Sequence, residues 1–180
     1  GSGGTFQLQS DLLLKTNCNL TKIAGTFDAN SHAVKFLDCY SSILSGQFNG
    51  ASSFYDLYFE GRTTSSAADV SIAASSNINI TNILTAKGNP LSKRFLIRGY
   101  GSGYTYQTQL TITAANVYFE YTDFACINAL GTADWDLSEI TGGSGNLCNN
   151  TGITFTEATT QTWQNADGGS WEDVNNWTSR

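Results

Sequence analysis

Two carboxylates beside an alternating run of apolar and polar residues are the first residues in this chain that could do chemistry. Glu120 and Asp123 follow Val117 and Phe119, whose spacing of two is that of a strand with one buried face. Glycosidic bonds are cleaved by paired carboxyl groups that lie about 5–5.5 Å or about 6.5–9.5 Å apart, with one group held protonated. Glu120 and Asp123 could share a groove and act as such a pair, and Asp134, Asp136 and Glu139 are further candidates. Solvated surface acids would explain them equally well.

Tyrosines are the second candidates, because flat exposed rings stack on sugar rings or pack against a protein partner. Strand alternation would place several of them on the outer face of a sheet. We favour a neighbouring subunit or module over a glycan as their partner. The contacting residues that we expect are Tyr100, Tyr104, Tyr106 and Tyr118, with Tyr55 and Tyr58 as further members.

The four cysteines fall into two pairs of nearly equal spacing, Cys18 with Cys39 and Cys126 with Cys148. Neither spacing matches a zinc knuckle, and the single His32 adds no clear further ligand. If the strands are parallel and in register, both Cβ atoms of a pair point the same way, which strains a disulfide. We expect Cys18 and Cys39 to be buried, stacked thiols, with a disulfide as the alternative. For Cys126 and Cys148 both states remain open.

Other kinds of chemistry lack the residues that they need. One histidine without a Gly-x-Ser-x-Gly turn argues against a nucleophilic triad, and no lysine follows the glycine-rich run 99–103 to hold a phosphate. Asp134 and Asp136 lack the spacing of a calcium loop. A net charge of −6 with nine dispersed basic residues argues against nucleic acid, and no apolar run approaches the roughly 18 residues of a membrane span. We expect no metal, no cofactor, no nucleic-acid partner and no membrane span.

Short strands must carry these residues. Apolar side chains recur at every second position along most of the chain, and no window of a dozen residues has a helical stripe. Two all-β architectures fit this pattern, a coiled parallel β-helix and an antiparallel β-sandwich.

A regular repeat in the first third of the chain favours the β-helix. In that fold, residues one coil apart lie above each other at about 4.8 Å, so that like residues stack. The sequence predicts a right-handed parallel β-helix, or β-solenoid, with coils of about 21 residues, and a β-sandwich is the alternative. The phenylalanines of the repeat should form one inward stack, with its first glycines at one corner. The three repeats are Gly4-Thr5-Phe6, Gly25-Thr26-Phe27 and Gly46-Gln47-Phe48.

Tryptophans mark a boundary near residue 157. Trp163, Trp171 and Trp177 lie close together, and only Trp135 precedes them. We predict that residues 1–156 are coils that end one module, and that residues 157–180 start a following module or cap the coils.

The last segment carries a recognisable motif: Trp163, then Gly168-Gly169-Ser170-Trp171-Glu172-Asp173, then Asn176-Trp177. It resembles the module-start motif of repetitive β-helix-type proteins of phage and bacterial surfaces, which are structural or adhesin-like repeats. Residues 4–11 and 25–30 are similar to later coils of that family. The cysteines are a departure from its typical member.

The resemblance and the repeat together imply a non-catalytic structural and adhesion module. It would belong to a phage virion appendage, such as a tail fibre, or to a bacterial surface fibre, and would provide length, rigidity and a display face. Expected partners are neighbouring modules or subunits of the same fibre, in a homo-oligomer, and a host-surface glycan. The expected location is extracellular, on a virion or cell surface. The alternative is a tailspike-like domain that binds or cleaves polysaccharide.

Overall fold

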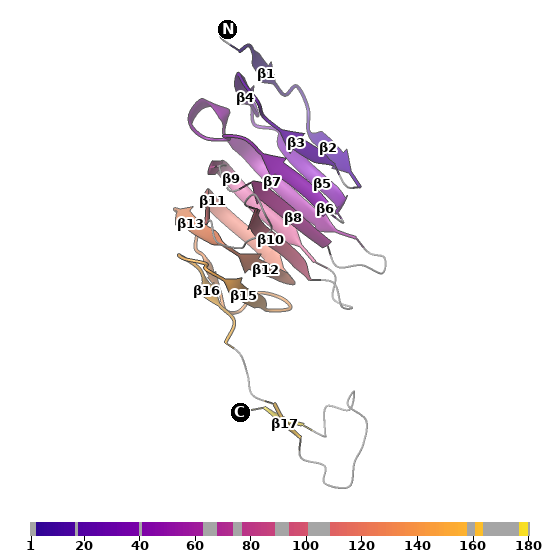
Figure 1. Ribbon diagram of the computed structural model, residues 1–180, viewed down its shortest axis with the longest axis vertical. Coiled ribbons are helices and arrows are strands. Elements are labelled where there is room, and N and C mark those ends of the chain that lie inside the picture. The colour runs from indigo at the N-terminus through magenta and orange to yellow at the C-terminus, as the bar shows by residue number, and fades with distance from the viewer. Residues whose placement is uncertain are drawn as a thin grey trace.

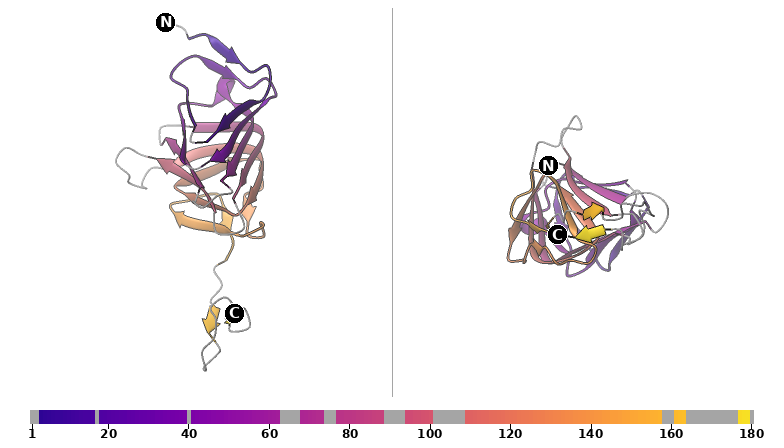
Figure 2. Two further views of the ribbon diagram at one scale, coloured as in Figure 1. Left: turned by 90° about the vertical axis from the view of Figure 1, so that its right-hand side faces the viewer. Right: turned by 90° about the horizontal axis from the view of Figure 1, so that it is seen from below.

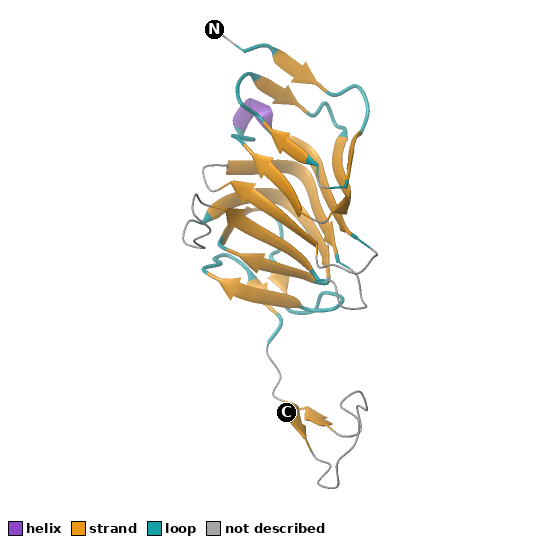
Figure 3. Cartoon of the chain, turned by 45° about the vertical axis from the view of Figure 1, so that its right-hand side comes forward, coloured by secondary structure: helices purple, strands orange, loops and turns teal. Residues whose placement is uncertain are grey.

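The computed structural model describes residues 3–16, 18–39, 41–62, 68–73, 77–88, 94–100, 109–157, 161–163 and 177–179. Within these residues every regular element is a strand except η1 (Gly50–Ser52), a single 3-10 turn. The all-β prediction is therefore confirmed for this part of the chain, as Figure 3 shows.

Most strands belong to two six-stranded parallel sheets, which we call sheet I and sheet II. In spatial order, sheet I contains β13 (Ile127–Gly131), β11 (Leu110–Glu120), β9 (Asn77–Lys87), β7 (Phe54–Gly61), β5 (Ala33–Cys39) and β2 (Leu12–Lys15). Sheet II contains β15 (Ser144–Cys148), β12 (Thr122–Ala125), β10 (Phe95–Tyr100), β8 (Ala68–Ala73), β6 (Ser41–Ser45) and β3 (Asn19–Thr21).

Three two-stranded pairs and two isolated bridges, Phe48 with Ile78 and Asn128 with Thr151, make up the rest of the strand pairing among the described residues. The first two are parallel, β1 (Thr5–Gln7) with β4 (Thr26–Asp28), and β14 (Asp136–Leu137) with β16 (Thr154–Phe155). The third is antiparallel, β17 (Gln161–Trp163) with β18 (Trp177–Ser179).

The chain passes back and forth between the two sheets, from β2 to β3, from β5 to β6, and so on to β13 and β15. Each strand of a sheet pairs in parallel with the strand that the chain laid down on its previous passage. The strands follow the sequence from one end of the molecule to the other (Figure 1). The alternative of an antiparallel sandwich is wrong, because every ladder in sheets I and II is parallel.

One inward column shows how the strands stay in register. Leu12 pairs with Val34, Val34 with Leu57, Leu57 with Leu84, and Leu84 with Val117. The step in residue number grows at every one of these pairings. The predicted coil length of about 21 residues is therefore close for the pairings from β1 to β7 and wrong for those of β9 and β11. The ladder fixes only the residues within the strands, and the connections between strands absorb the difference in length.

The core lies between the two sheets, which enclose a common interior in Figure 2. Its largest fully buried side chains are phenylalanines, whose rings contact each other from strand to strand. The ring centroids of Phe36 and Phe59 lie 5.1 Å apart, and those of Phe59 and Phe95 lie 5.8 Å apart. All three are fully buried, and burying one such side chain is worth about 1.5–3 kcal/mol.

The predicted stack of three phenylalanines forms, but its outer member is not buried. Phe6 pairs with Phe27 in register with ring centroids 6.2 Å apart, and Phe27 meets Phe48 edge-on at 5.6 Å. Phe27 and Phe48 are buried, whereas 61% of Phe6 is exposed. Phe6 lies on β1, whose one partner among the described strands is β4, so one side of its ring is left uncovered.

The predicted glycine corner holds for two of its three members. Gly25 has φ +76°, and a Cβ there would lie 2.3 Å from the carbonyl oxygen of Gly4. A Cβ at Gly46 would instead lie 2.3 Å from the carbonyl oxygen of Lys22. Gly46 follows β6, which pairs with β3, so its neighbour is the residue after β3 rather than Gly25.

The Trp-rich segment is described only in part. Trp163 and Trp177 are in register across the antiparallel pair β17–β18, while Trp171 and the residues 168–170, 172, 173 and 176 of the motif lie outside the described residues. The pairing changes from parallel to antiparallel after β16. The module boundary near residue 157 stays a prediction.

Candidate functional site

The outer face of sheet I gathers two tyrosines, two glutamates and a lysine on three adjacent strands. Leu57 and Phe59 point into the core, so strand alternation turns Tyr58 and Glu60 of β7 outward. The register then places Thr85 and Lys87 of β9 beside them, and Tyr118 and Glu120 of β11 beyond. We call the set Tyr58, Glu60, Lys87, Tyr118 and Glu120 the tyrosine–glutamate face.

Each tyrosine on this face is fixed by the glutamate two residues later. The Tyr58 hydroxyl donates a 2.7 Å hydrogen bond to Oε2 of Glu60, and the Tyr118 hydroxyl donates to Oε1 of Glu120. Lys87 Nζ lies 3.6 Å from Oε1 of Glu120 and 5.0 Å from the centroid of the Tyr118 ring. An ammonium at that distance over an aromatic face is attracted by the ring quadrupole.

Burial and the neighbouring glutamates raise the pKa values of the two phenols. Burial, followed by the hydrogen bond to Glu60, raises the pKa of Tyr58 well above its usual value. The hydrogen bond to Glu120 and that carboxylate's charge raise the pKa of Tyr118. Both hydroxyls therefore remain hydrogen-bond donors at every ordinary pH.

A hollow of about 280 Å³ adjoins this face at Tyr118, whose side chain is 47% exposed. Asp134, Asp136 and Glu139 line it together with the apolar residues Val117, Phe119, Leu137 and Ile140. Asp136 accepts hydrogen bonds from the backbone and hydroxyl of Ser138, and these bonds lower the pKa of Asp136. Aromatic, carboxylate and ammonium groups next to a hollow are the elements that recognise the ring faces and hydroxyls of a sugar.

The two carboxylates expected to act as a pair lie on different sheets. Glu120 ends β11 in sheet I and faces Lys87, whereas Asp123 lies on β12 in sheet II and faces Arg94. Tyr121, with φ +49°, forms the corner between them. Glu60, by contrast, lies on the same sheet as Glu120, and both are in register with Lys87.

Arg94 forms a clamp between Asp123 and a turn. Its Nε and one terminal nitrogen donate to the Asp123 carboxylate at 2.7–2.8 Å, and the guanidinium also donates to the carbonyl oxygens of Gly142 and Gly143. The side chain of Asp123 is only 16% exposed. The Asp123 carboxylate is paired with the arginine, and the same arginine binds the turn, so we assign this ion pair a structural role.

The two cysteine pairs differ. Cys39 is buried, and its burial raises its pKa to about 11. The expectation that Cys18 is also buried is wrong, because Cys18 is half-exposed and its thiol donates to the carbonyl oxygen of Lys15 at 2.7 Å. By contrast, the sulfur atoms of Cys126 and Cys148 lie 3.2 Å apart. All four residues are thiols in this structure.

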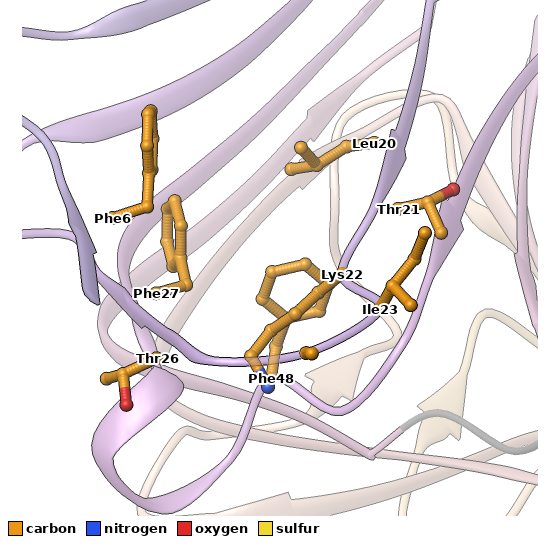
Figure 4. Close-up of a pocket in the computed structure, with 9 residues that line it drawn as sticks. Phe6, Leu20, Thr21, Lys22, Ile23, Thr26, Phe27 and Phe48 are labelled. Atoms are coloured by element: carbon orange, nitrogen blue, oxygen red, sulfur yellow. The ribbon is translucent and has the colours of Figure 1, made fainter. Parts of the chain in front are cut away.

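The N-terminal end of the core opens into an apolar pocket of about 340 Å³ (Figure 4). Phe6, Phe27 and Phe48 line one part of it, and Leu20 and Ile23 line another. Ile23 is 93% exposed. This pocket contains one charged side chain, Lys22, and no carboxylate among its lining residues.

Several sequence expectations about this surface remain untested. Tyr104 and Tyr106 lie outside the described residues, and of Tyr100 only the backbone, at the end of β10, is described. Among the residues that the structure does describe, no group of three or more His, Cys, Asp or Glu side chains could hold a metal ion. The same part of the chain contains no helix with the length and hydropathy to cross a membrane.

Comparison with protein-family models, with curated proteins and with solved structures finds no match to this chain.

Sequence reasoning missed Glu60, Lys87 and Arg94 as members of these arrangements. Glu60, Lys87 and Glu120 are far apart along the chain and lie on three different strands. Only the register of the parallel ladders brings them together. The one available signal was the tyrosine–x–glutamate spacing, which occurs both at Tyr58 and at Tyr118.

Proposed function

We propose that this chain is a right-handed parallel β-helix with a structural and adhesive role. It would be a non-catalytic module of a phage virion appendage, such as a tail fibre, or of a bacterial surface fibre. The observation that carries the proposal is the path of the chain, which alternates between two parallel sheets around one continuous core. In such a path each passage of the chain rests on the one before it.

This arrangement suits a spacer. Backbone hydrogen bonds run from strand to strand along the stack, and the phenylalanine contacts run in the same direction. Repeating units that contact mainly their neighbours build extended, stiff particles with long side faces. Partners would then be neighbouring modules or subunits of the same fibre, with the side faces left for a host surface.

Location provides the test. Antibodies raised against this chain should label an external fibre in immunogold electron microscopy of intact virions or cells from the source organism. Labelling confined to the cell interior would contradict the proposal. Pre-absorbing the antibody with the purified chain gives the control for specific labelling.

A second candidate function is binding of a polysaccharide, and the tyrosine–glutamate face favours it. Exposed Tyr118 lies on this face with the two glutamates and Lys87, and it also lines a hollow that contains three acids. The test is a glycan array probed with the wild-type chain and with Tyr118→Ala. Binding that survives Tyr118→Ala would exclude this face, and Leu130→Ala, at an exposed position on β13 of the same sheet, is the matched control.

Cleavage of a polysaccharide is distinguished from binding by the length of the product. Glu60 and Glu120 lie on strands separated by one strand, at roughly 10 Å between strand axes, close to the spacing of about 6.5–9.5 Å used by inverting enzymes. Shortening of a bound glycan by the wild-type chain, lost in both Glu60→Gln and Glu120→Gln, would establish a depolymerase. Binding without shortening would support an adhesive face.

A further inference from the structure

The thiols of Cys126 and Cys148 are in direct contact. Their sulfur atoms are 3.2 Å apart, and the backbone N–H of Cys126 donates to the carbonyl oxygen of Cys148 at 2.8 Å. A disulfide needs about 2.05 Å between sulfurs and Cα atoms within about 7 Å. The backbones already lie at the distance of neighbouring strands, so only a side-chain adjustment of roughly 1 Å separates the thiols from bonding distance.

An irregularity in the ladder removes the strain expected for parallel, in-register cysteines. Between β12 and β15 the register shifts after Phe124, so that Cys148 pairs with Ala125 instead of Cys126. Cys126 lies one residue beyond β12, at φ +59°. Because Cys126 lies outside the regular strand, its side chain does not have to point the same way as that of Cys148. The two sulfur atoms can therefore approach each other.

We propose that Cys126 and Cys148 form an intramolecular disulfide by exchange with a low-molecular-weight disulfide such as oxidised glutathione. Cys148 is half-exposed, next to exposed Leu147, and reacts first. Its thiolate attacks one sulfur of glutathione disulfide, forming a mixed disulfide and releasing one glutathione thiolate. The Cys126 thiolate then attacks the Cys148 sulfur, forming the protein disulfide and releasing the second glutathione. Two protein thiols are oxidised and one glutathione disulfide is reduced to two thiols.

The disulfide would stabilise the edge strand of sheet II. β15 is the outer strand of sheet II, and β12 is its one partner in that sheet. Cys126 follows β12 and Cys148 ends β15, so the bond would join the last passages of the chain through sheet II. Cross-linking two residues that are distant in sequence also removes freedom from the unfolded chain, which stabilises the folded state.

The test counts thiols in the full chain. The purified, reduced protein is incubated with glutathione disulfide, denatured, labelled with N-ethylmaleimide and weighed by mass spectrometry. The expected result is a fall from four labels to two, reversed by a reductant. No basic residue lies between Arg98 and Arg180, so trypsin leaves both cysteines in one peptide, and a protease specific for acidic residues must cut at Asp134, Asp136 or Glu139 to show the cross-link.

Variants make the outcome decisive. Cys18→Ser removes the other half-exposed thiol, and this variant should fall from three labels to one. Adding Cys148→Ser to it should leave two labels both before and after exposure to glutathione disulfide. Cys126→Ser should trap glutathione on Cys148, which shows that this thiol reacts first. The proposal is overturned if the wild-type chain keeps four labels, or if the cross-linked peptides contain Cys18 or Cys39.

Discussion

Glu60 and Glu120 flank one lysine on the outer face of sheet I, each in register with Lys87 from the opposite side. The two glutamates also accept hydrogen bonds from equivalent tyrosines, Tyr58 and Tyr118. β7 and β11 therefore present the same tyrosine–x–glutamate unit on either side of β9. The same motif therefore occurs twice on this surface, on strands that are separated by one strand. Such a surface suits a ligand that is itself repetitive.

The hydroxyl of Tyr118 should ionise at lower pH when its carboxylate partner loses its charge. Glu120→Gln weakens the hydrogen bond and removes the negative charge that together raise the pKa of Tyr118, so this pKa should move towards the value of about 10 for a free tyrosine. The measurement is the ultraviolet absorbance of tyrosinate during a titration, compared between the variant and the wild type. Glu157→Gln, at an exposed position after β16, should leave the titration unchanged.

The same raised pKa values predict how stability changes in alkali. Tyr58 and Tyr118 bind their protons more tightly in the folded chain than in the unfolded chain, so the contribution is fully present below a pH of about 10. It is lost as pH rises through the folded-state values. The free energy of unfolding in urea should therefore decline above pH of about 10, and the decline should be smaller in Glu120→Gln. An equal decline in both proteins would contradict the role of Glu120.

Removing the guanidinium of Arg94 should cost more stability than breaking an exposed ion pair. Arg94→Met leaves the largely buried Asp123 carboxylate and the Gly143 carbonyl oxygen without this donor. We expect a loss of about 1–3 kcal/mol, less than for a fully buried pair because Arg94 is partly exposed. Lys35→Met, which breaks the exposed pair with Asp11, should cost about 0–1 kcal/mol. Equal losses in urea unfolding would show that the clamp is no stronger than a surface pair.

Truncating a phenylalanine should cost much more stability at the centre of the core than at its N-terminal end. Phe59→Ala removes a fully buried ring that packs between Phe36 and Phe95, and we expect a loss of about 3–5 kcal/mol. Phe6→Ala removes a ring that is mostly exposed, and the loss should be below about 1 kcal/mol. Chemical denaturation of both variants checks the difference. A large effect of Phe6→Ala would mean that the N-terminal end is covered in solution.

A glycine at the end of β13 should resist substitution. Gly131 has φ +106°, and a Cβ there would lie 2.1 Å from the carbonyl oxygen of Ala114 on the paired strand. Gly131→Ala should destabilise the fold by about 1–3 kcal/mol through backbone strain and movement of this contact. Gly4→Ala, where a Cβ would meet nothing within 4 Å, is the control and should be nearly neutral. Matching thermal transitions for the two variants would contradict the strain at Gly131.

The sequence predicts the class of fold well, because period-two alternation and the recurrence of Phe6 and Phe27 are local signals of parallel strands. It misjudges the length of the repeat, because connections of different length separate strands that stay in register, as the step from Leu84 to Val117 shows. It identifies Tyr118 and Glu120 but pairs Glu120 with Asp123, the nearest acid along the chain. The position of Glu60 depends on two ladders, and the convergence of Cys126 and Cys148 depends on a register shift, neither of which leaves a pattern in the sequence.

The inward column from Leu12 to Val117 has a practical consequence. Its steps along the chain lengthen from each pairing to the next while the side chains remain aligned, so the connections change in length without displacing the core. Peptide insertions should then be tolerated at the corners and rejected within the strands. The connections between strands could therefore be replaced by an epitope or an affinity tag. The choice of connection would set the position of the inserted peptide along the stack of strands.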